Sequence, residues 1–132
     1  MATVRYLVTD VDRARAFYLD QLGFEPGVDK RPAFAVVQHG DLVVWLSGPA
    51  SSAARHMPDG RRPEPGGWNR FVIEVDDIEA AIAPLRAAGV LFRNRVVVGP
   101  GGKQILVEDP DGNVIELFEP SRTPLHAPDR RP

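Results

Sequence analysis

The 132-residue sequence contains no cysteine, which excludes disulfides, thiolate nucleophiles and zinc sites built on thiolates. It also lacks an excess of either charge, because 16 Lys and Arg stand against 18 Asp and Glu, for a formal net charge of -2. A protein that binds nucleic acid usually has a basic surface, so nucleic acid is not an expected partner.

Long apolar runs are missing too. The longest are pieces such as residues 42–46, far short of the roughly 20 residues that cross a bilayer. Residues 1–8 have one arginine and a strand-like run, without the pattern of a signal peptide. We therefore expect no membrane role and, by default, a cytoplasmic location. With 43% hydrophobic and 26% charged residues, the composition is typical of an ordinary globular domain.

An internal repeat organises the chain. The segment VTDV at 8–11 returns as VDDI at 75–78, an offset of 67 positions (75 minus 8). The segment GDLVV at 40–44 returns as GNVIE at 112–116, an offset of 72 positions (112 minus 40). Two pairs of similar segments in the same order, at similar offsets, predict two copies of one structural module.

Each half reads as one strand, one helix and three further strands. Asp10 and Asp77 are in position to cap the two helices, and Gly23 and Gly89 to end them, while Pro84 should bend or shorten the second helix. The expected strands are residues 3–8, 24–28, 33–38 and 42–47, then 70–75, 90–98, 104–108 and 114–118. We therefore expect one domain over 1–120, with modules 3–47 and 68–118, a connection over 48–67 and a flexible tail over 121–132.

Three motifs add a family resemblance: AFY at 16–18, LGF at 22–24, and VEDPDGNVIEL at 107–117. Together with the two helix openings they resemble the vicinal oxygen chelate superfamily, which includes glyoxalases, bleomycin resistance proteins and ring-cleaving dioxygenases. The resemblance spans residues 3 to about 120. It implies an α+β fold in which two βαβββ modules form a curved eight-stranded sheet around a shared pocket, with helices outside. It also implies a homodimer.

In that family four side chains from the first and last strands of each module hold a divalent metal. The matching positions here are Thr3, Val44, Arg70 and Glu116. A threonine is a poor ligand, a valine is none, and arginine is a permanent cation. A catalytic metal needs about three suitable protein ligands, so we expect no metal cofactor. The alternative is a divalent metal held through Glu116.

Strand alternation predicts which side chains face the shared pocket. The predicted ligand-binding residues are Thr3, Arg5, Val44, Leu46, Arg70, Val72, Glu116 and Phe118. Arg70 and Glu116 are expected either to pair with each other or to orient an anionic group of a ligand. The same alternation puts Trp45 in the core, while Trp68 is left as either a core residue or a stacking rim.

These observations favour a metal-independent protein that binds a small, partly apolar organic molecule. The alternative is an enzyme of the same superfamily: a metal-dependent lyase, isomerase or ring-cleaving dioxygenase, or a metal-free relative with Glu116 as base. A dimeric interaction module without any ligand is a third reading. No catalytic residue is assigned.

Overall fold

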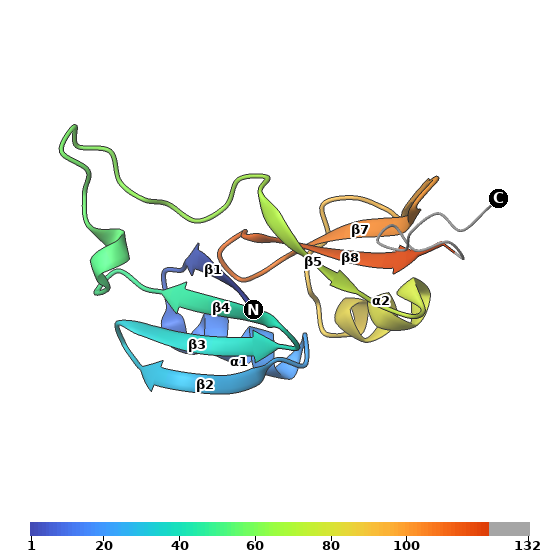
Figure 1. Ribbon diagram of the computed structural model, residues 1–132, viewed down its shortest axis with the longest axis horizontal. Helices are drawn as coiled ribbons and strands as arrows, with labels where there is room; N and C mark the ends of the chain where they lie inside the picture. The colour runs from blue at the N-terminus through green and yellow to red at the C-terminus, as the bar shows by residue number, and fades with distance from the viewer. Residues whose placement is uncertain (122–132) are drawn as a thin grey trace. The chain divides into compact units, whose positions relative to one another are not determined.

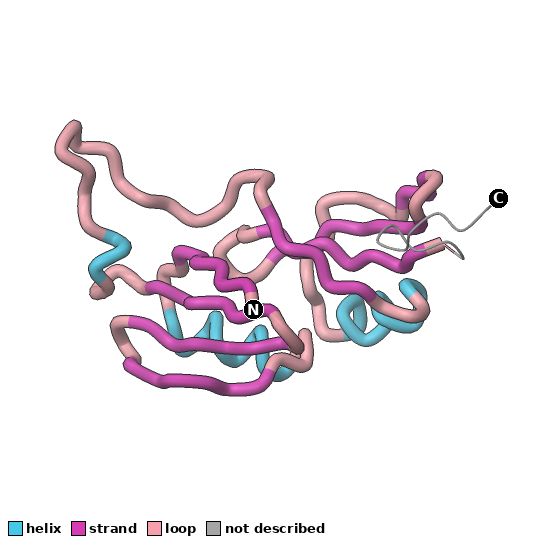
Figure 2. Tube along the Cα trace, viewed as in Figure 1, coloured by secondary structure: helices cyan, strands magenta, loops and turns pink. Residues whose placement is uncertain are grey.

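The computed structural model describes residues 1–121 (Figures 1 and 2). Apart from Ser121, the predicted flexible tail lies outside the described residues. The first half contains β1 (Ala2–Leu7), α1 (Val11–Asp20), β2 (Glu25–Lys30), β3 (Phe34–His39), β4 (Leu42–Ser47) and the short 3-10 helix η1 (Ser52–Ala54). The second contains β5 (Arg70–Glu74), α2 (Ile78–Ala87), β6 (Val97–Gly99), β7 (Gly102–Glu108) and β8 (Val114–Pro120).

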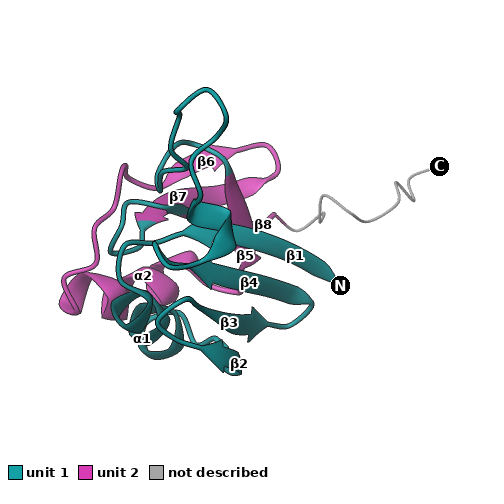
Figure 3. Cartoon of the chain, turned by 90° about the vertical axis from the view of Figure 1, so that its left-hand side faces the viewer, with its two compact units in different colours: residues 1–69, 108–114 teal, residues 70–107, 115–132 magenta. Residues whose placement is uncertain are grey.

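The eight strands form two four-stranded sheets, with the orders β1-β4-β3-β2 and β5-β8-β7-β6. The α+β fold of two βαβββ modules is therefore confirmed. The chain divides into two compact units (Figure 3): Met1–Asn69 with Glu108–Val114, and Arg70–Val107 with the segment from Ile115 onward. In the first sheet β1 runs parallel to β4, and β3 runs antiparallel to both β4 and β2.

Both helices begin where the sequence predicts. The side chain of Asp10 accepts a hydrogen bond from the amide of Arg13, and that of Asp77 accepts from the amides of Glu79 and Ala80. Such caps satisfy amides that have no partner within the helix. Each helix has ten residues, and α2 contains Pro84. Neither helix is long and apolar enough to cross a membrane, within the described part of the chain.

One face of the first sheet packs against α1. The helix buries Val11, Ala14 and Tyr18, which recur at the three- and four-residue spacing of one helical face. The buried sheet residues that alternate onto a common face are Tyr6 and Val8 from the first-strand region, Ala35 and Val37 from β3, and Val44 and Leu46 from β4. This packing forms the core of the first unit and leaves the other face of its sheet uncovered by α1.

The predicted strand over 90–98 is wrong in extent. Only Val97–Gly99 form a strand, which pairs with β7, while Phe92 makes a single bridge to Val107. The side chain of Asn94 accepts a hydrogen bond from the amide of Leu106 at 2.9 Å. An asparagine side chain that takes a ladder amide competes with backbone pairing, and this interrupts the strand at Asn94.

The loop before β8 belongs to the first unit and is built on the carboxylate of Asp109. This carboxylate is 4% exposed and accepts four hydrogen bonds. The donors are the hydroxyl of Tyr18 (2.9 Å), the amide of Asp111 (2.9 Å), and both the amide (2.9 Å) and side-chain nitrogen (3.0 Å) of Asn113. The side chain of Asn113 also donates to the carbonyl of Leu7 (2.8 Å). The loop is therefore attached to both α1 and the end of β1.

Burial determines the ionisation of this cluster. It raises the pKa of Asp109 above its ordinary value, although the hydrogen bonds from Asn113 and Tyr18 act in the opposite direction. Burial, followed by the nearby Asp109 charge, raises the pKa of the Tyr18 phenol well above 10.0. Tyr18 therefore keeps its proton and remains a donor to Asp109.

Removing the hydroxyl of Tyr18 should destabilise the fold more than removing that of Tyr6. The Tyr6 hydroxyl also donates a buried hydrogen bond, but to the neutral carbonyl of Val114. We expect Tyr18→Phe to lower the free energy of unfolding by about 1.5–3 kcal/mol and Tyr6→Phe by about 0.5–1.5 kcal/mol, as measured in urea, because a hydrogen bond to a charged group is stronger. Equal losses would contradict a special role for the Asp109 carboxylate.

The pH dependence of stability should carry the signature of Asp109. Because its folded pKa is raised above the ordinary 3.8, its contribution is complete below that value and is lost as the pH rises through the folded pKa. The wild-type chain should therefore lose stability relative to Asp109→Asn as the pH rises from 3.8 toward neutrality. Urea unfolding of both proteins over a pH series measures this trend. If the wild type instead gains stability relative to Asp109→Asn as the pH rises, the pKa of Asp109 is not raised in the folded state.

Candidate functional site

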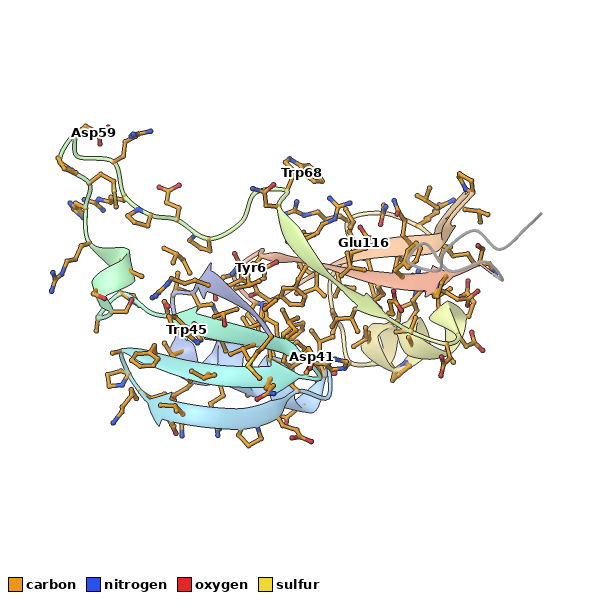
Figure 4. The ribbon with its side chains drawn as sticks, in the orientation of Figure 1. Tyr6, Asp41, Trp45, Asp59, Trp68 and Glu116 are labelled. Atoms are coloured by element: carbon orange, nitrogen blue, oxygen red, sulfur yellow. The ribbon has the colours of Figure 1, made fainter. Side chains whose placement is uncertain are left out.

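The face of the first sheet opposite α1 carries an arginine and a tryptophan side by side. Arg5 of β1 is the register partner of Trp45 on β4, and Trp45 is the partner of Val36 on β3. Register partners project from the same side of a sheet. These three side chains therefore form a row across three strands, and Trp45, labelled in Figure 4, is 39% exposed.

A pocket of about 530 Å³ lies over this row. Apolar side chains supply most of its wall. The lining residues are Arg5, Val28, Ala33, Phe34, Val36, Trp45, Ala50, Ser51 and Ser52. They come from all four strands of the sheet or the segments beside them, and from the first residues of the connection that follows β4.

A tight turn after β4 brings the connection to the pocket. The amide of Gly48 donates to the carbonyl of Ala33 at 2.9 Å, and the Ser51 hydroxyl donates to the Gly48 carbonyl at 2.7 Å. A Cβ atom at Gly48 would lie 2.6 Å from a methyl carbon of Val11 and 3.1 Å from the carbonyl oxygen of Pro32. Only glycine allows this close approach, which positions Ala50 and Ser51 as part of the wall.

Arg5 is held over the indole ring. Its guanidinium carbon lies 4.9 Å from the centroid of Trp45, a distance at which the ring face attracts a cation. One guanidinium nitrogen donates to the hydroxyl of Ser47 at 3.2 Å. Ser47 is 1% exposed and Arg5 lies on the edge strand of the sheet. The arginine is therefore oriented by two fixed neighbours and remains open to solvent.

Another arginine, Arg31 between β2 and β3, pairs with one acidic residue of β2 and one of α1. Arg31 forms ion pairs with Asp29 at 2.7 Å and with Asp12 at 3.0 Å. The hydrogen bonds from Arg31 lower the pKa of Asp29 to about 2. Among the residues that line the pocket, Arg5 is the only charged one. The electrostatic character of the pocket is therefore that of one cation in an apolar wall.

The pair of Arg70 and Glu116, which the sequence analysis singled out, lies in the second unit. Two guanidinium nitrogens of Arg70 approach one oxygen of Glu116, at 3.0 and 2.9 Å. The Glu116 side chain is 9% exposed and that of Arg70 is 28% exposed. The predicted ion pair is thus present, and Figure 4 labels Glu116 on β8. The Glu116 carboxylate therefore already has a permanent counter-charge. A cation or hydrogen-bond donor of a ligand would have to displace Arg70 to bind this carboxylate.

The predicted orientation of β4 is wrong by one residue. Val44 and Leu46 are fully buried on the face toward α1, and Trp45, predicted to be core, lies on the open face. Backbone hydrogen bonds explain the error: Val8 donates to Ser47, and the equivalent Val75 donates to Phe118. The last strands therefore correspond at an offset of 71 (118 minus 47) rather than 72, so the equivalent of Glu116 is Trp45.

The remaining predicted site residues are divided between the units. In the first, Thr3 is exposed and shares the Arg5 face of β1, but it is not part of the pocket lining. In the second, Val72 is 49% exposed and Phe118 is 8% exposed. Trp68 is 67% exposed, which excludes its reading as a core residue.

Sequence reasoning missed most of the pocket wall. The residues that it did not assign to the pocket are Val28, Ala33, Phe34, Val36, Ala50, Ser51 and Ser52, as well as Trp45, which it assigned to the core. A usable signal existed for Trp45. If the two last strands are aligned on Leu46 and Leu117, rather than on Gly40 and Gly112, Trp45 falls at the position of Glu116 and on the face away from the core.

The residues at the family's metal-ligand positions do not fit a divalent cation. With the corrected register these positions hold Thr3, Trp45, Arg70 and Glu116. The four side chains therefore supply one carboxylate, one hydroxyl, one indole and one guanidinium. The carboxylate is paired with the guanidinium. Nor do any three His, Asp or Glu side chains come close enough to hold a metal ion within residues 1–121. A divalent site requires several oxygen or nitrogen ligands.

Comparisons with known proteins agree with the fold. Residues 1–117 match the family model described as Glyoxalase/Bleomycin resistance protein/Dioxygenase superfamily. The uncharacterized protein YaeR of Escherichia coli (strain K12) is 30% identical over 119 residues, which cover 88% of this chain and 92% of YaeR.

Two solved structures extend the comparison. A member of the same superfamily from Sphaerobacter thermophilus DSM 20745 is 30% identical, with a TM-score of 0.73, over 90% of this chain and 95% of that one. TnmS3, an antibiotic binding protein from Streptomyces sp. CB03234, is 28% identical, with a TM-score of 0.69, over 90% of this chain and 93% of TnmS3.

Alanine substitutions at two adjacent positions test the corrected orientation of β4. Leu46→Ala should lower the free energy of unfolding by about 2–5 kcal/mol, because it opens a cavity in the core. Trp45→Ala should cost less, about 1–3 kcal/mol, because 39% of the residue is already exposed to water and its removal leaves no closed cavity. Chemical denaturation followed by circular dichroism measures both. If Trp45→Ala lowered the free energy of unfolding more than Leu46→Ala, Trp45 would be a core residue and the corrected orientation would be wrong.

Proposed function

Because the chain belongs to the Glyoxalase/Bleomycin resistance protein/Dioxygenase superfamily, we propose that it is a metal-independent binding protein for a small, partly apolar organic molecule. The ligand occupies the pocket over Arg5 and Trp45. The observation that carries the proposal is this pocket of about 530 Å³. Its volume falls in the range of roughly 300–1,000 Å³ that small-molecule sites occupy.

The composition of the wall supports binding of an organic molecule. Val28, Phe34 and Val36 supply apolar surface, and Trp45 supplies a wide aromatic surface. Trp45 is left 39% exposed on the sheet face. A ligand that covers its ring lowers the free energy of the complex, since apolar surface is then removed from water. Arg5 and the serine hydroxyls supply the few polar groups that orient a bound molecule.

The donor set supports metal independence. A threonine, a tryptophan and an arginine stand at three family ligand positions, and the remaining carboxylate, Glu116, is paired with Arg70. The similarity to TnmS3, an antibiotic binding protein at 28% identity, supports a binding role over the metal-dependent lyase, isomerase or dioxygenase chemistry of other superfamily members. The homodimer and the cytoplasmic location expected from the sequence stay predictions.

A neutral fluorescent probe tests the proposal. N-phenyl-1-naphthylamine, whose emission rises in apolar surroundings, should bind the full chain saturably after exhaustive dialysis against EDTA. Adding back Ni²⁺, Zn²⁺ or Mn²⁺ should leave the dissociation constant unchanged. Trp45→Ala should weaken binding by about 5- to 150-fold, since stacking on one aromatic side chain contributes about 1–3 kcal/mol.

Trp68→Ala is the matched control, because it removes the other tryptophan, which is exposed and outside the pocket lining. Its affinity for the probe should equal that of the wild type. Binding that appears only after a divalent metal is added would replace the proposal with a metal-dependent function. Equal weakening by both tryptophan variants would place the ligand elsewhere.

A further inference from the structure

We infer that the ligand is a planar aromatic molecule that carries an anionic group, such as a carboxylate, and that Arg5 selects it by its charge. This inference rests on the proposed function and specifies the chemical class that the pocket takes. It starts from the hydrogen-bonding state of Arg5, which is the one charged residue of the lining.

Arg5 has unused binding capacity. A guanidinium group carries five N–H donors, and within residues 1–121 Arg5 makes one hydrogen bond, to Ser47, and no ion pair. Arg70, by contrast, is paired with Glu116. The Ser47 hydroxyl and the Trp45 ring hold the guanidinium in place without neutralising it. A preorganised arginine with free N–H groups matches a planar carboxylate, which it can bind through two parallel hydrogen bonds.

The charges around the pocket favour an anion. The lining contains no acidic residue, and Asp29, which follows the lining residue Val28, is already paired with Arg31. A cationic ligand would meet Arg5 with no carboxylate to offset the repulsion. A neutral ligand that covered the pocket would remove water from Arg5 without replacing the lost hydrogen bonds, which is unfavourable. An anionic acceptor compensates for this loss more fully than a neutral one, because a hydrogen bond between two charged groups is stronger.

The position of the cation also defines the shape of the ligand. Arg5 lies over the indole ring at 4.9 Å, so the anion-binding group and the aromatic surface are adjacent. The neighbouring Val36 and Phe34 extend the apolar surface along β3. A flat ring that contacts this surface can place a directly attached carboxylate at the guanidinium. A flexible aliphatic acid of similar charge would gain less from the aromatic surface.

Two probes of the same shape separate charge from ring binding. 2-Naphthoate and 2-naphthamide share the naphthalene ring, but only the first carries a negative charge at pH 7. Isothermal titration calorimetry with the full chain should give an affinity for 2-naphthoate about 10- to 100-fold higher than for 2-naphthamide, as expected for a hydrogen-bonded charge. Raising the salt concentration should narrow this ratio, because exposed charges are screened.

Variants assign the preference to Arg5. Arg5→Gln should reduce the ratio of the two affinities to about one, and Arg5→Lys should retain part of it, because lysine keeps the charge but not the planar donor pair. Arg62→Gln makes the same change in net charge at an exposed position outside the lining and should leave the ratio as in the wild type. Trp45→Leu should weaken both probes alike. Circular dichroism confirms that each variant is folded.

The outcomes distinguish the two proposals. Equal affinities for both probes in the wild type, or a preference that survives Arg5→Gln, would overturn selection by charge while leaving a small-molecule pocket in place. Failure of both the naphthalene probes and the neutral fluorescent probe would overturn the proposed function and this inference together.

Discussion

Tyr18, Asn113 and the amide of Asp111 all donate hydrogen bonds to one buried carboxylate, that of Asp109. A buried carboxylate without partners is highly unfavourable, so the loop and its donors are stable only together. Because Asn113 also donates to the carbonyl of Leu7, this cluster attaches the loop before β8 to α1 and to the end of β1. The cluster therefore adds a polar attachment between α1 and the end of β1 to the apolar packing of α1 on the first sheet.

The two faces of the first sheet differ in burial, so core packing and the proposed binding site lie on opposite faces. Its face toward α1 holds fully buried residues such as Val44 and Leu46, whereas the open face holds Arg5 and the partly exposed Trp45. Substitutions on a buried face change core packing, and substitutions on an open face change it little. The residues of the open face, which we propose bind the ligand, can therefore vary without loss of the fold. This separation explains how a shared fold can accept different ligands.

The sequence predicted the fold better than the site. The VxD helix openings have a direct physical meaning as N-caps, and alternation in β1 and β5 correctly separated Arg5 and Arg70 from the buried side chains. The face of β4 was wrong because the two turn glycines are not equivalent: Gly40 lies seven positions before Ser47, whereas Gly112 lies six positions before Phe118. A shift of one residue reverses which face each side chain occupies. The wall contributed by Ala50 and Ser51 depends on the Gly48 turn, which periodicity does not reveal.

The two modules treat equivalent positions in different ways. Trp45 and Glu116 occupy the same place in their modules, and each lies beside an arginine. In the second unit the carboxylate of Glu116 neutralises Arg70. In the first unit an indole ring lies beside Arg5, and its quadrupole attracts a cation without cancelling the charge. One arginine is therefore compensated within the protein, and the other retains the capacity to attract an external anion. The difference of a single side chain at this position converts a structural ion pair into a candidate recognition site.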